Sequence, residues 1–387
     1  MAEETRQEQI QAAEVEKIDK IKSSIEKLKN KQSKFLFFIA GTPNPAASVY
    51  EIYFHATVMK NAGYDVKMLT DSPQYQIPDW IEKELTDIPH ESMEQSRLTV
   101  SPEDVLVIPE IFSNVMEQTK NLPSIRVGLL QSADYMLNGL MPGVDWKSFG
   151  VEKIVTTSNN LKDIVEEFFG KTYDIKVYNP GIPDYFKYNG ELKRPVVSIV
   201  GRNSNEIAKV VKLFYAKFPQ FSWITFDSMF TESKPPQPMR RKDYADRLKK
   251  NFAGVWVDRI ASLGTFPLEC MKAGTVPVAL VPDIQPEYLL DDEGNPKENI
   301  GVWTNDIYAI PLLIGDIITK FLDDTISDEI TEEMAKVVEN YDPKDAGEQL
   351  QAIYQGFLDE RLGVFERTLE AMTTEKTEEI TEEVKQD

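Results

Sequence analysis

The sequence predicts an α/β protein whose two halves, each a doubly wound parallel sheet, face each other across a cleft. Short apolar runs alternate with longer amphipathic segments along most of the chain, which is the pattern of a parallel sheet covered by helices on both faces. The alternation breaks once, near Gly190, where charged residues interrupt it. The length of 387 residues suits two domains of roughly 150 residues each, together with extensions.

The overall charge makes nucleic acid an unlikely partner. Lys and Arg total 43 against 64 Asp and Glu, which gives a formal net charge of -21. A protein that binds phosphate backbones is expected to carry an excess of positive charge instead. A local basic cluster favours nucleic acid, and it consists of Arg240, Arg241, Lys242, Arg247, Lys249 and Lys250.

The cysteine and histidine content limits the compartment and the metal chemistry. Cys270 is the single cysteine, so an internal disulfide is impossible and a reducing, cytoplasmic location is expected. The polar N-terminus lacks the apolar centre of a secretory signal, and no apolar run approaches the roughly 18 residues of a membrane span. His55 and His90 are the two histidines, so we expect no metal site, and we interpret His55 as a packing residue within a helix.

Residues 1–33 are expected to form an N-terminal helical extension, because they are almost wholly helix formers without Gly or Pro. An apolar seam about two heptads long runs along this helix. It consists of Ile18, Ile21, Ile25 and Leu28. Two interpretations stay open: the helix lies on the body of the protein, or the chain self-associates through residues 10–30, although so short a coil seldom holds alone.

Residues 34–188 are expected to form the first domain. The apolar run KFLFFIA at residues 34–40 has the length of a buried strand, Gly41 begins a turn, and a helical segment follows over residues 46–61. Further strands are predicted at residues 65–70, 104–108, 125–130 and 153–157. The segments between them are helical or irregular, so the strands are expected to pair in parallel.

Residues 189–345 are expected to form the second domain. Its strands are predicted at residues 195–200, 222–226, 254–257, 276–280 and 301–303. A long amphipathic C-terminal helix is expected over residues 346–372, and the acidic tail 373–387 is expected to be frayed or disordered because it has little to bury. Ligands of open α/β sheets bind at the carboxyl ends of the strands, so the site is expected in the cleft between the two domains.

The most informative segment is residues 254–283, which read as a buried strand, a glycine turn with an N-cap, a helix and a second buried strand. Unpaired N–H groups and the positive end of the helix dipole predict an anion site, such as one for a nucleotide diphosphate, beside Ser262, Gly264 and Thr265. Glu269, about one turn further on, could accept hydrogen bonds from a ribose diol. A purely structural role fits the same local pattern equally well.

A series of landmarks occurs in a characteristic order between residue 34 and about residue 372. The landmarks are the serine-ended strand at 154–158, the strand and Asn179-Pro180-Gly181 turn at 176–186, Val200-Gly201-Arg202, residues 262–271, and Pro286-Glu287. Together they resemble the GT-B glycosyltransferases, specifically the large retaining group 1 or family 4-like enzymes that use nucleotide sugars. The resemblance implies two Rossmann-like domains, the first for the acceptor and the second for the nucleotide-sugar donor.

The resemblance also implies roles for individual residues. Arg202 and Lys209 would hold the donor diphosphate, and a planar guanidinium is suited to grip phosphate oxygens. Glu269 would hold the ribose, and the loop that begins at Gly41 would leave room for the donor. Catalysis would depend on Arg202 and Glu269, with Asp258 at the end of a strand that points to the cleft.

The implied function is transfer of a sugar from a UDP-sugar or GDP-sugar to an unknown acceptor, with retention, without a metal and without a permanently bound cofactor. Two positions depart from the family pattern, since its first glutamate falls on Ala261 and its first-domain histidine on Gln131. Two alternatives therefore stay open. The chain could be a catalytically degenerate GT-B-like binding or assembly module, or a glycosyltransferase that acts on modified DNA bases.

Overall fold

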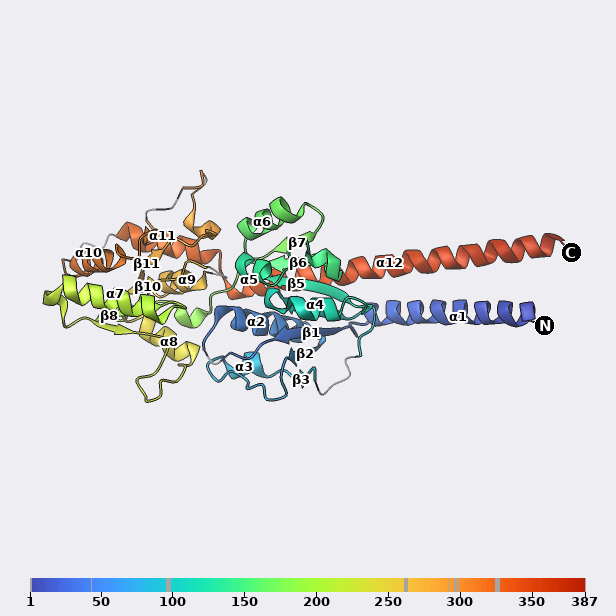
Figure 1. Ribbon diagram of the computed structural model, residues 1–387, viewed down its shortest axis with the longest axis horizontal. Helices are drawn as coiled ribbons and strands as arrows, with labels where there is room; N and C mark the ends of the chain where they lie inside the picture. The colour runs from blue at the N-terminus through green and yellow to red at the C-terminus, as the bar shows by residue number, and fades with distance from the viewer. Residues whose placement is uncertain are drawn as a thin grey trace.

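Two α/β domains lie side by side in the computed structural model, and two helices leave the first domain together at one end (Figure 1). The structure describes residues 2–42, 44–94, 99–260, 264–291, 293–295, 297, 299–323 and 328–386, without the side chains of 2–11, 328–329 and 375–386. Among these residues, no helix combines the length and the apolar character needed to cross a membrane.

The first domain contains a seven-stranded sheet in the order β3-β2-β1-β4-β5-β6-β7, with every pair parallel. Its strands are β1 (Lys34–Ile39), β2 (Asp65–Thr70), β3 (His90–Ser92), β4 (Val105–Pro109), β5 (Ile125–Leu130), β6 (Lys153–Thr156) and β7 (Asp174–Val177). Its helices are α2 (Ala47–Asn61), α3 (Lys83–Thr86), α4 (Ser113–Gln118), α5 (Ala133–Asn138) and α6 (Asn159–Phe169). The central strands are buried on both faces, as their continuous apolar runs require.

The second domain contains a five-stranded parallel sheet in the order β12-β11-β10-β8-β9. Its strands are β8 (Arg194–Val200), β9 (Thr225–Asp227), β10 (Asn251–Trp256), β11 (Val276–Leu280) and β12 (Val302–Thr304). Its helices are α7 (Ser204–Lys217), α8 (Arg241–Leu248), α9 (Thr265–Lys272), α10 (Ile310–Leu322) and α11 (Asp328–Glu339). The prediction of two doubly wound parallel halves is therefore confirmed.

Helix α12 (Pro343–Gln386) returns from the second domain to the first. Leu350, Tyr354, Phe357 and Leu358 pack in the same hydrophobic core as Phe35 of β1. The helix is longer than expected, because it continues through the residues that were predicted to form a frayed or disordered tail after residue 372. Glu and Lys, which favour helices, recur in that segment, and it contains no Gly or Pro that would end helix α12.

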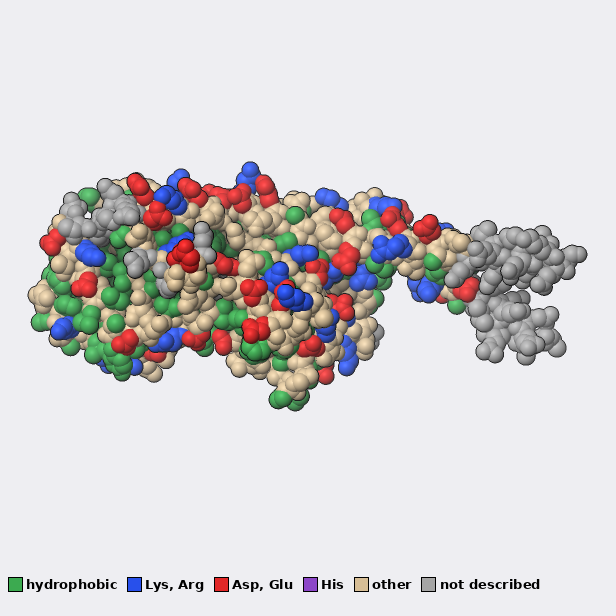
Figure 2. All heavy atoms as spheres, turned by 90° about the horizontal axis from the view of Figure 1, so that it is seen from above, with side chains coloured by type: hydrophobic (Ala, Val, Ile, Leu, Met, Phe, Trp, Pro, Cys, Tyr) green, Lys and Arg blue, Asp and Glu red, His purple; other side chains and the backbone are tan. Residues whose placement is uncertain are grey.

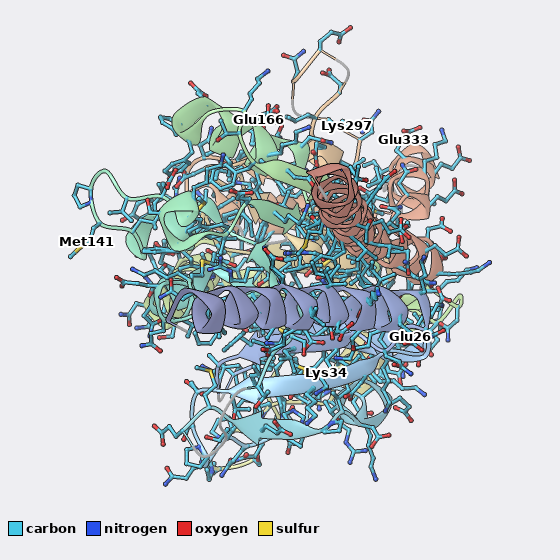
Figure 3. All side chains as sticks on the ribbon, turned by 90° about the vertical axis from the view of Figure 1, so that its right-hand side faces the viewer. Glu26, Lys34, Met141, Glu166, Lys297 and Glu333 are labelled. Atoms are coloured by element: carbon cyan, nitrogen blue, oxygen red, sulfur yellow. The ribbon has the colours of Figure 1, made fainter. Side chains whose placement is uncertain are left out.

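Helix α1 (Ala2–Lys29) lies along α12, and both ends of the chain are at the same end of the molecule (Figure 1). Figure 3 views the molecule from that end and shows α1 in front of the first domain. Leu28 is buried in the first-domain core, while Ile18, Ile21 and Ile25 of the predicted seam are half-buried. The seam is thus covered at least in part within the chain itself.

Candidate functional site

A cleft of about 820 Å³ lies between the two domains, at the carboxyl ends of strands from both sheets. Its first-domain lining includes Thr42, Asn44, Ser48, Tyr50, Trp80 and Tyr135, and its second-domain lining includes Gly201, Arg202, Arg241, Asp258, Gly264, Thr265 and Glu269. Thr42 follows β1, Gly201 follows β8 and Asp258 follows β10, so the doubly wound topology brings these loops together. The cleft is where the sequence places the site.

The start of α9 is built on a glycine. Gly264 is the N-cap residue, with φ 59° and ψ 31°, a left-handed conformation that favours glycine. Its carbonyl accepts a hydrogen bond from the hydroxyl of Tyr288, which fixes the turn. Gly264 has no side chain to cap the helix, and Thr265 is the first residue of the helix rather than its cap. Both residues line the cleft, so the start of α9 lies at the cleft. Ser262 and Ala261 lie outside the described residues.

Glu269 lines the cleft and already has a partner. Its side chain is 4% exposed and Oε1 accepts a hydrogen bond from Nη2 of Arg241, in an ion pair buried on both sides. The Cζ atom of Arg241 lies 3.6 Å from the ring centroid of Tyr50, which belongs to the first domain. Burial raises the pKa of Glu269, and the Arg241 charge opposes that rise. Arg241 is a site residue that sequence reasoning missed, since it appeared there only as part of the basic cluster.

Arg202 and Asp258 form the second charged pair in the cleft. The Nε atom of Arg202 lies 2.8 Å from Oδ2 of Asp258, and its Nη1 donates to the hydroxyl of Tyr135 at 2.7 Å. Tyr135 belongs to the first domain, so this pair also bridges the two domains. Burial raises the pKa of Asp258, which Arg202 counteracts. The two residues predicted from strand ends therefore meet in the cleft.

Two other predicted residues lie outside the lining. Nζ of Lys209 is 5.4 Å from the ring centroid of Tyr308, and Lys209 is not among the described residues that line the cleft. Gly41 precedes the lining residue Thr42, and a Cβ atom added to it would meet Tyr75 at an ordinary contact distance of 3.8 Å. Space alone does not require glycine at that position.

Two buried polar residues follow the central strands of the first domain, Glu110 after β4 and Gln131 after β5. Gln131 is 2% exposed, and its Nε2 donates to the carbonyl of Ser48 at 3.1 Å, so its amide has a structural role. Glu110 is also buried, and burial raises the pKa of its carboxyl group to about 8, against the effect of the backbone N–H groups of Gln131 and Ser132. Its Oε2 has no hydrogen-bond partner among the described residues.

A buried polar chain connects α2, the end of β7 and α12 behind the cleft. The hydroxyl of Tyr178 donates to Oε2 of Glu51 at 2.9 Å and lies 2.7 Å from Nε2 of His55. The hydroxyl of Tyr354 lies 2.9 Å from Nδ1 of His55. Burial lowers the pKa of His55 to about 3 and raises that of Glu51 to about 7. His55 is therefore a neutral, packed residue, as predicted.

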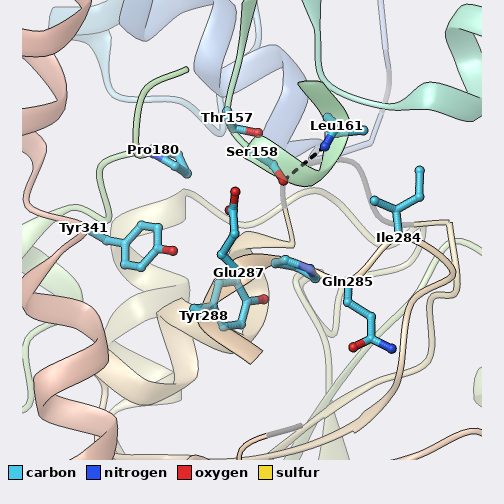
Figure 4. Close-up of a pocket in the computed structure, with 10 residues that line it drawn as sticks. Thr157, Ser158, Leu161, Pro180, Ile284, Gln285, Glu287, Tyr288 and Tyr341 are labelled. Atoms are coloured by element: carbon cyan, nitrogen blue, oxygen red, sulfur yellow. Dashed lines mark hydrogen bonds between the residues drawn. The ribbon is translucent and has the colours of Figure 1, made fainter. Parts of the chain in front are cut away.

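The segment around Pro286 and Glu287 in the second domain contacts the first domain. The carboxylate of Glu287 accepts a hydrogen bond from the N–H of Asn159 at the start of α6. Asn160 donates from its amide to the carbonyl of Gln285. Figure 4 shows Glu287 pointing toward Ser158 across a small pocket. Glu287 thus contacts the first domain, and neither Pro286 nor Glu287 is among the described residues that line the cleft.

Metal binding has no support in the described part of the chain, where no group of three or more His, Cys, Asp or Glu side chains is arranged to hold an ion.

Comparison with known proteins identifies the fold. No protein-family model and no curated protein sequence matches this chain. Sucrose-phosphate synthase from Thermosynechococcus elongatus superposes with a TM-score of 0.59 at 11% identity, over 85% of this chain and 100% of that one. HepE from Anabaena, solved with UDP-glucose, gives 0.59 at 12% identity over 84% and 99%. The pneumococcal O-GlcNAc transferase GtfA, solved with UDP and GlcNAc, gives 0.58 at 8% identity over 86% and 99%. The GT-B fold predicted from the sequence is confirmed.

Proposed function

We propose that the protein is a glycosyltransferase that binds a nucleotide-sugar donor in the cleft between its two domains. One observation carries the proposal: a single cleft of about 820 Å³ brings together Arg202, the start of α9 and the carboxylate of Glu269. Its volume lies in the range of roughly 300–1,000 Å³ that small-molecule sites occupy. Two of the similar structures were solved with UDP or UDP-glucose, which supports a nucleotide sugar as the donor class.

The chemistry would depend on stabilising the departing nucleoside diphosphate. Transfer breaks the bond between the anomeric carbon and the diphosphate oxygen, and forms a bond from that carbon to an acceptor oxygen, which loses its proton. Negative charge grows on the diphosphate while the sugar becomes oxocarbenium-like. Arg202 and the N–H groups at the start of α9 supply positive potential directed at that charge, so no metal is needed for this step.

Retention follows if the acceptor attacks the sugar face from which the diphosphate leaves. In that arrangement the departing phosphate oxygen can itself take the proton of the acceptor. Asp258 is bound to Arg202, so we assign to it the orientation of the guanidinium rather than a nucleophilic role. Glu269 would accept hydrogen bonds from the ribose hydroxyl groups.

A degenerate GT-B module that binds without catalysis is the second candidate. The observation that favours it is Gln131, which stands at the position of the family's histidine and is buried against Ser48 instead of facing the cleft. Such a module could keep a nucleotide site while lacking turnover, so the two candidates differ in product release rather than in binding.

Transfer to modified DNA bases gains no support from the basic cluster. Arg241 is buried against Glu269, Lys249 lies 2.8 Å from Asp246, and Lys250 lies 3.1 Å from Glu191. These acidic partners neutralise half of the residues in the cluster. The face shown in Figure 2 also mixes acidic and basic side chains without a continuous basic patch.

The test is a thermal-shift and calorimetric screen of the full chain against UDP, GDP, ADP and their common sugars. We expect one nucleotide family to raise the melting temperature, and Arg202→Met to reduce its affinity by about ten- to a hundredfold, because a charged hydrogen bond to phosphate is lost. Lys212→Met, on the exposed side of α7, is the matched control and should bind as the wild type does.

The same samples separate the two candidates. Slow release of nucleoside diphosphate from a bound nucleotide sugar, by transfer to water, supports the enzyme. Binding without any release supports the module. If no nucleotide or nucleotide sugar binds to the wild-type protein, both proposals are wrong.

A further inference from the structure

The carboxylate that is proposed to hold the ribose is already oriented by a cation. Only Oε1 of Glu269 is bonded to Arg241 in the described contacts, which leaves Oε2 for a ligand in the cleft. Arg241 is the first residue of α8 and Glu269 lies within α9, so two separate elements of the second domain create the pair.

The first domain holds Arg241 in place. The main-chain N–H of Arg241 donates to the carbonyl of Trp80 at 2.9 Å, and its guanidinium lies 3.6 Å from the ring centroid of Tyr50. The ring of Phe186 lies 5.6 Å from the same Cζ atom. The guanidinium is 5% exposed, and its Nη1 has no hydrogen-bond partner among the described residues. A cation stacked on an aromatic ring in a dry site has little freedom to move.

The ion pair with Arg241 also affects whether the carboxyl group of Glu269 is ionised. Burial raises the pKa of Glu269, and without a neighbouring cation a carboxyl group in such a site is expected to be neutral. Burial is the largest single effect on the pKa of Arg241 and lowers it, but the charge and hydrogen bond of Glu269 together with Tyr185 and Tyr50 raise it overall, so the guanidinium stays charged. An ionised carboxylate accepts hydrogen bonds from hydroxyl groups more strongly than a neutral carboxyl group does.

We propose that Arg241 is a positioning residue of the donor site, which holds Oε1 of Glu269 so that Oε2 faces the ribose hydroxyl groups. The inference rests on the proposed function, since it concerns the donor site of that reaction. Because Tyr50 and Trp80 belong to the first domain, the orientation of Glu269 depends on the contact between the two domains. A change in that contact therefore changes the affinity for the donor.

Other titratable groups interact with the Arg241–Glu269 pair, and their effect on pH-dependent binding must be separated from that of Glu269. They are Glu51 on α2, Glu82 before α3, and the hydroxyl groups of Tyr50 and Tyr185. Burial raises the pKa of Glu51 to about 7, so its own titration could alter binding near neutral pH. The variant Glu51→Gln removes that contribution and serves as the background for the pH series.

The experiment measures the affinity for UDP-glucose and GDP-mannose by calorimetry between about pH 6 and pH 9, because their diphosphates carry no group that titrates in that range. In Arg241→Met, Glu269 loses the cation that opposes the effect of burial, so its pKa rises further and we expect a larger share of the carboxyl group to be neutral at neutral pH. We expect donor affinity to fall by about tenfold or more at neutral pH and to recover as rising pH ionises Glu269. The double variant Arg241→Met/Glu269→Gln should bind weakly without any such recovery.

Three outcomes are decisive. Recovery with pH in Arg241→Met, absent from the double variant and from the protein with Arg241 intact, supports the inference. A loss of affinity that is the same at every pH, or no loss at all, overturns it while leaving the proposed function in place. Failure of the wild-type protein to bind either donor overturns the proposed function instead. If Arg241→Met does not fold, Arg241→Gln replaces it, since the amide can still donate to Oε1 without carrying the charge, and the same recovery with pH is expected.

Discussion

At the scale of single residues, the sequence alone identifies some of the side chains that line the cleft and misses others. Arg202, Asp258 and Glu269 could be found because each lies at the end of a strand or the start of a helix, where the topology directs it to the cleft. Arg241 could not be found in this way. Its role depends on Tyr50, a residue of the other domain, and only the packed structure brings the two together.

Gly264 is a residue whose replacement should damage the site directly. An alanine there would occupy the left-handed region, and its Cβ would lie 3.0 Å from both Pro286 and the hydroxyl of Tyr288. We expect Gly264→Ala to lower the free energy of unfolding by about 1–2 kcal/mol and to weaken donor binding, because the start of α9 must move. Urea unfolding and calorimetry measure the two effects.

The control for Gly264→Ala is Gly63→Ala. Gly63 also has positive φ, at 93°, but nothing lies within 4 Å of the Cβ that alanine would add, and it is not among the residues that line the cleft. This variant should lose a similar amount of stability and bind the donor normally. Equal donor affinity in both glycine variants would show that the start of α9 does not contact the ligand.

At the scale of elements, the sequence predicts the strands that have long apolar runs. It misses a short strand that forms only because it pairs with the strand beside it. Strand β3 contains only His90, Glu91 and Ser92, and it exists because it pairs with β2. Strand β10 was expected to begin at Gly254, whereas this glycine lies inside the strand. A Cβ atom there would lie 2.3 Å from Sγ of Cys270, so the glycine allows α9 to pack closely on the sheet.

Helix α2 gives the protein a predictable dependence of stability on pH. Burial raises the pKa of Glu51 from its ordinary value of 4.5 to about 7, so the folded protein holds a proton that the unfolded chain releases above pH 4.5. The contribution of Glu51 to the free energy of unfolding is therefore fully present at low pH and is lost as pH rises toward 7. Glu51→Gln stays neutral and should lack this loss.

Urea unfolding at several pH values measures the difference. Between pH 5 and pH 8, Glu51→Gln should gain stability relative to the wild type, by up to about 1.4 kcal/mol per pH unit over the range in which Glu51 titrates. Burial lowers the pKa of His55 from 6.5 to about 3, so its contribution increases stability as pH rises over that interval, and this effect is common to both proteins. Parallel curves for the two proteins would mean that Glu51 is ionised in the folded state throughout.

At the scale of the whole molecule, α12 makes the two domains interdependent. It begins beside the second domain and buries Leu350, Tyr354 and Phe357 in the core of the first, where the ring of Tyr354 meets Phe35 of β1 edge to face at 5.6 Å. The sequence predicts the helix from its periodicity but not its destination, because an amphipathic face could pack on either sheet. Helix α12 therefore connects the second domain to the core of the first, in addition to the contact at Arg241.

The pairing of α1 with α12 leads to a prediction about oligomeric state. Lys29 lies 2.7 Å from Glu366 of α12, and Lys27 lies 2.6 Å from Glu103 of the first domain. Ile21, in the middle of the seam, is half-buried. Because α1 already packs on α12 and the seam is partly covered within one chain, we expect a monomer in sedimentation experiments, and we expect Ile21→Glu to leave the mass unchanged.

Ile21→Glu should instead separate α1 from α12. Placing a charge in a half-buried apolar seam removes about 1–2 kcal/mol of packing, so hydrogen exchange should increase in α1 and in residues 360–372 of α12, while the two sheets stay protected. Lys22→Glu places the same charge on the exposed side of the helix and should change neither region. A dimeric wild type that becomes monomeric in Ile21→Glu would show that the seam joins two chains, and that residues 10–30 mediate the self-association that their sequence alone leaves open.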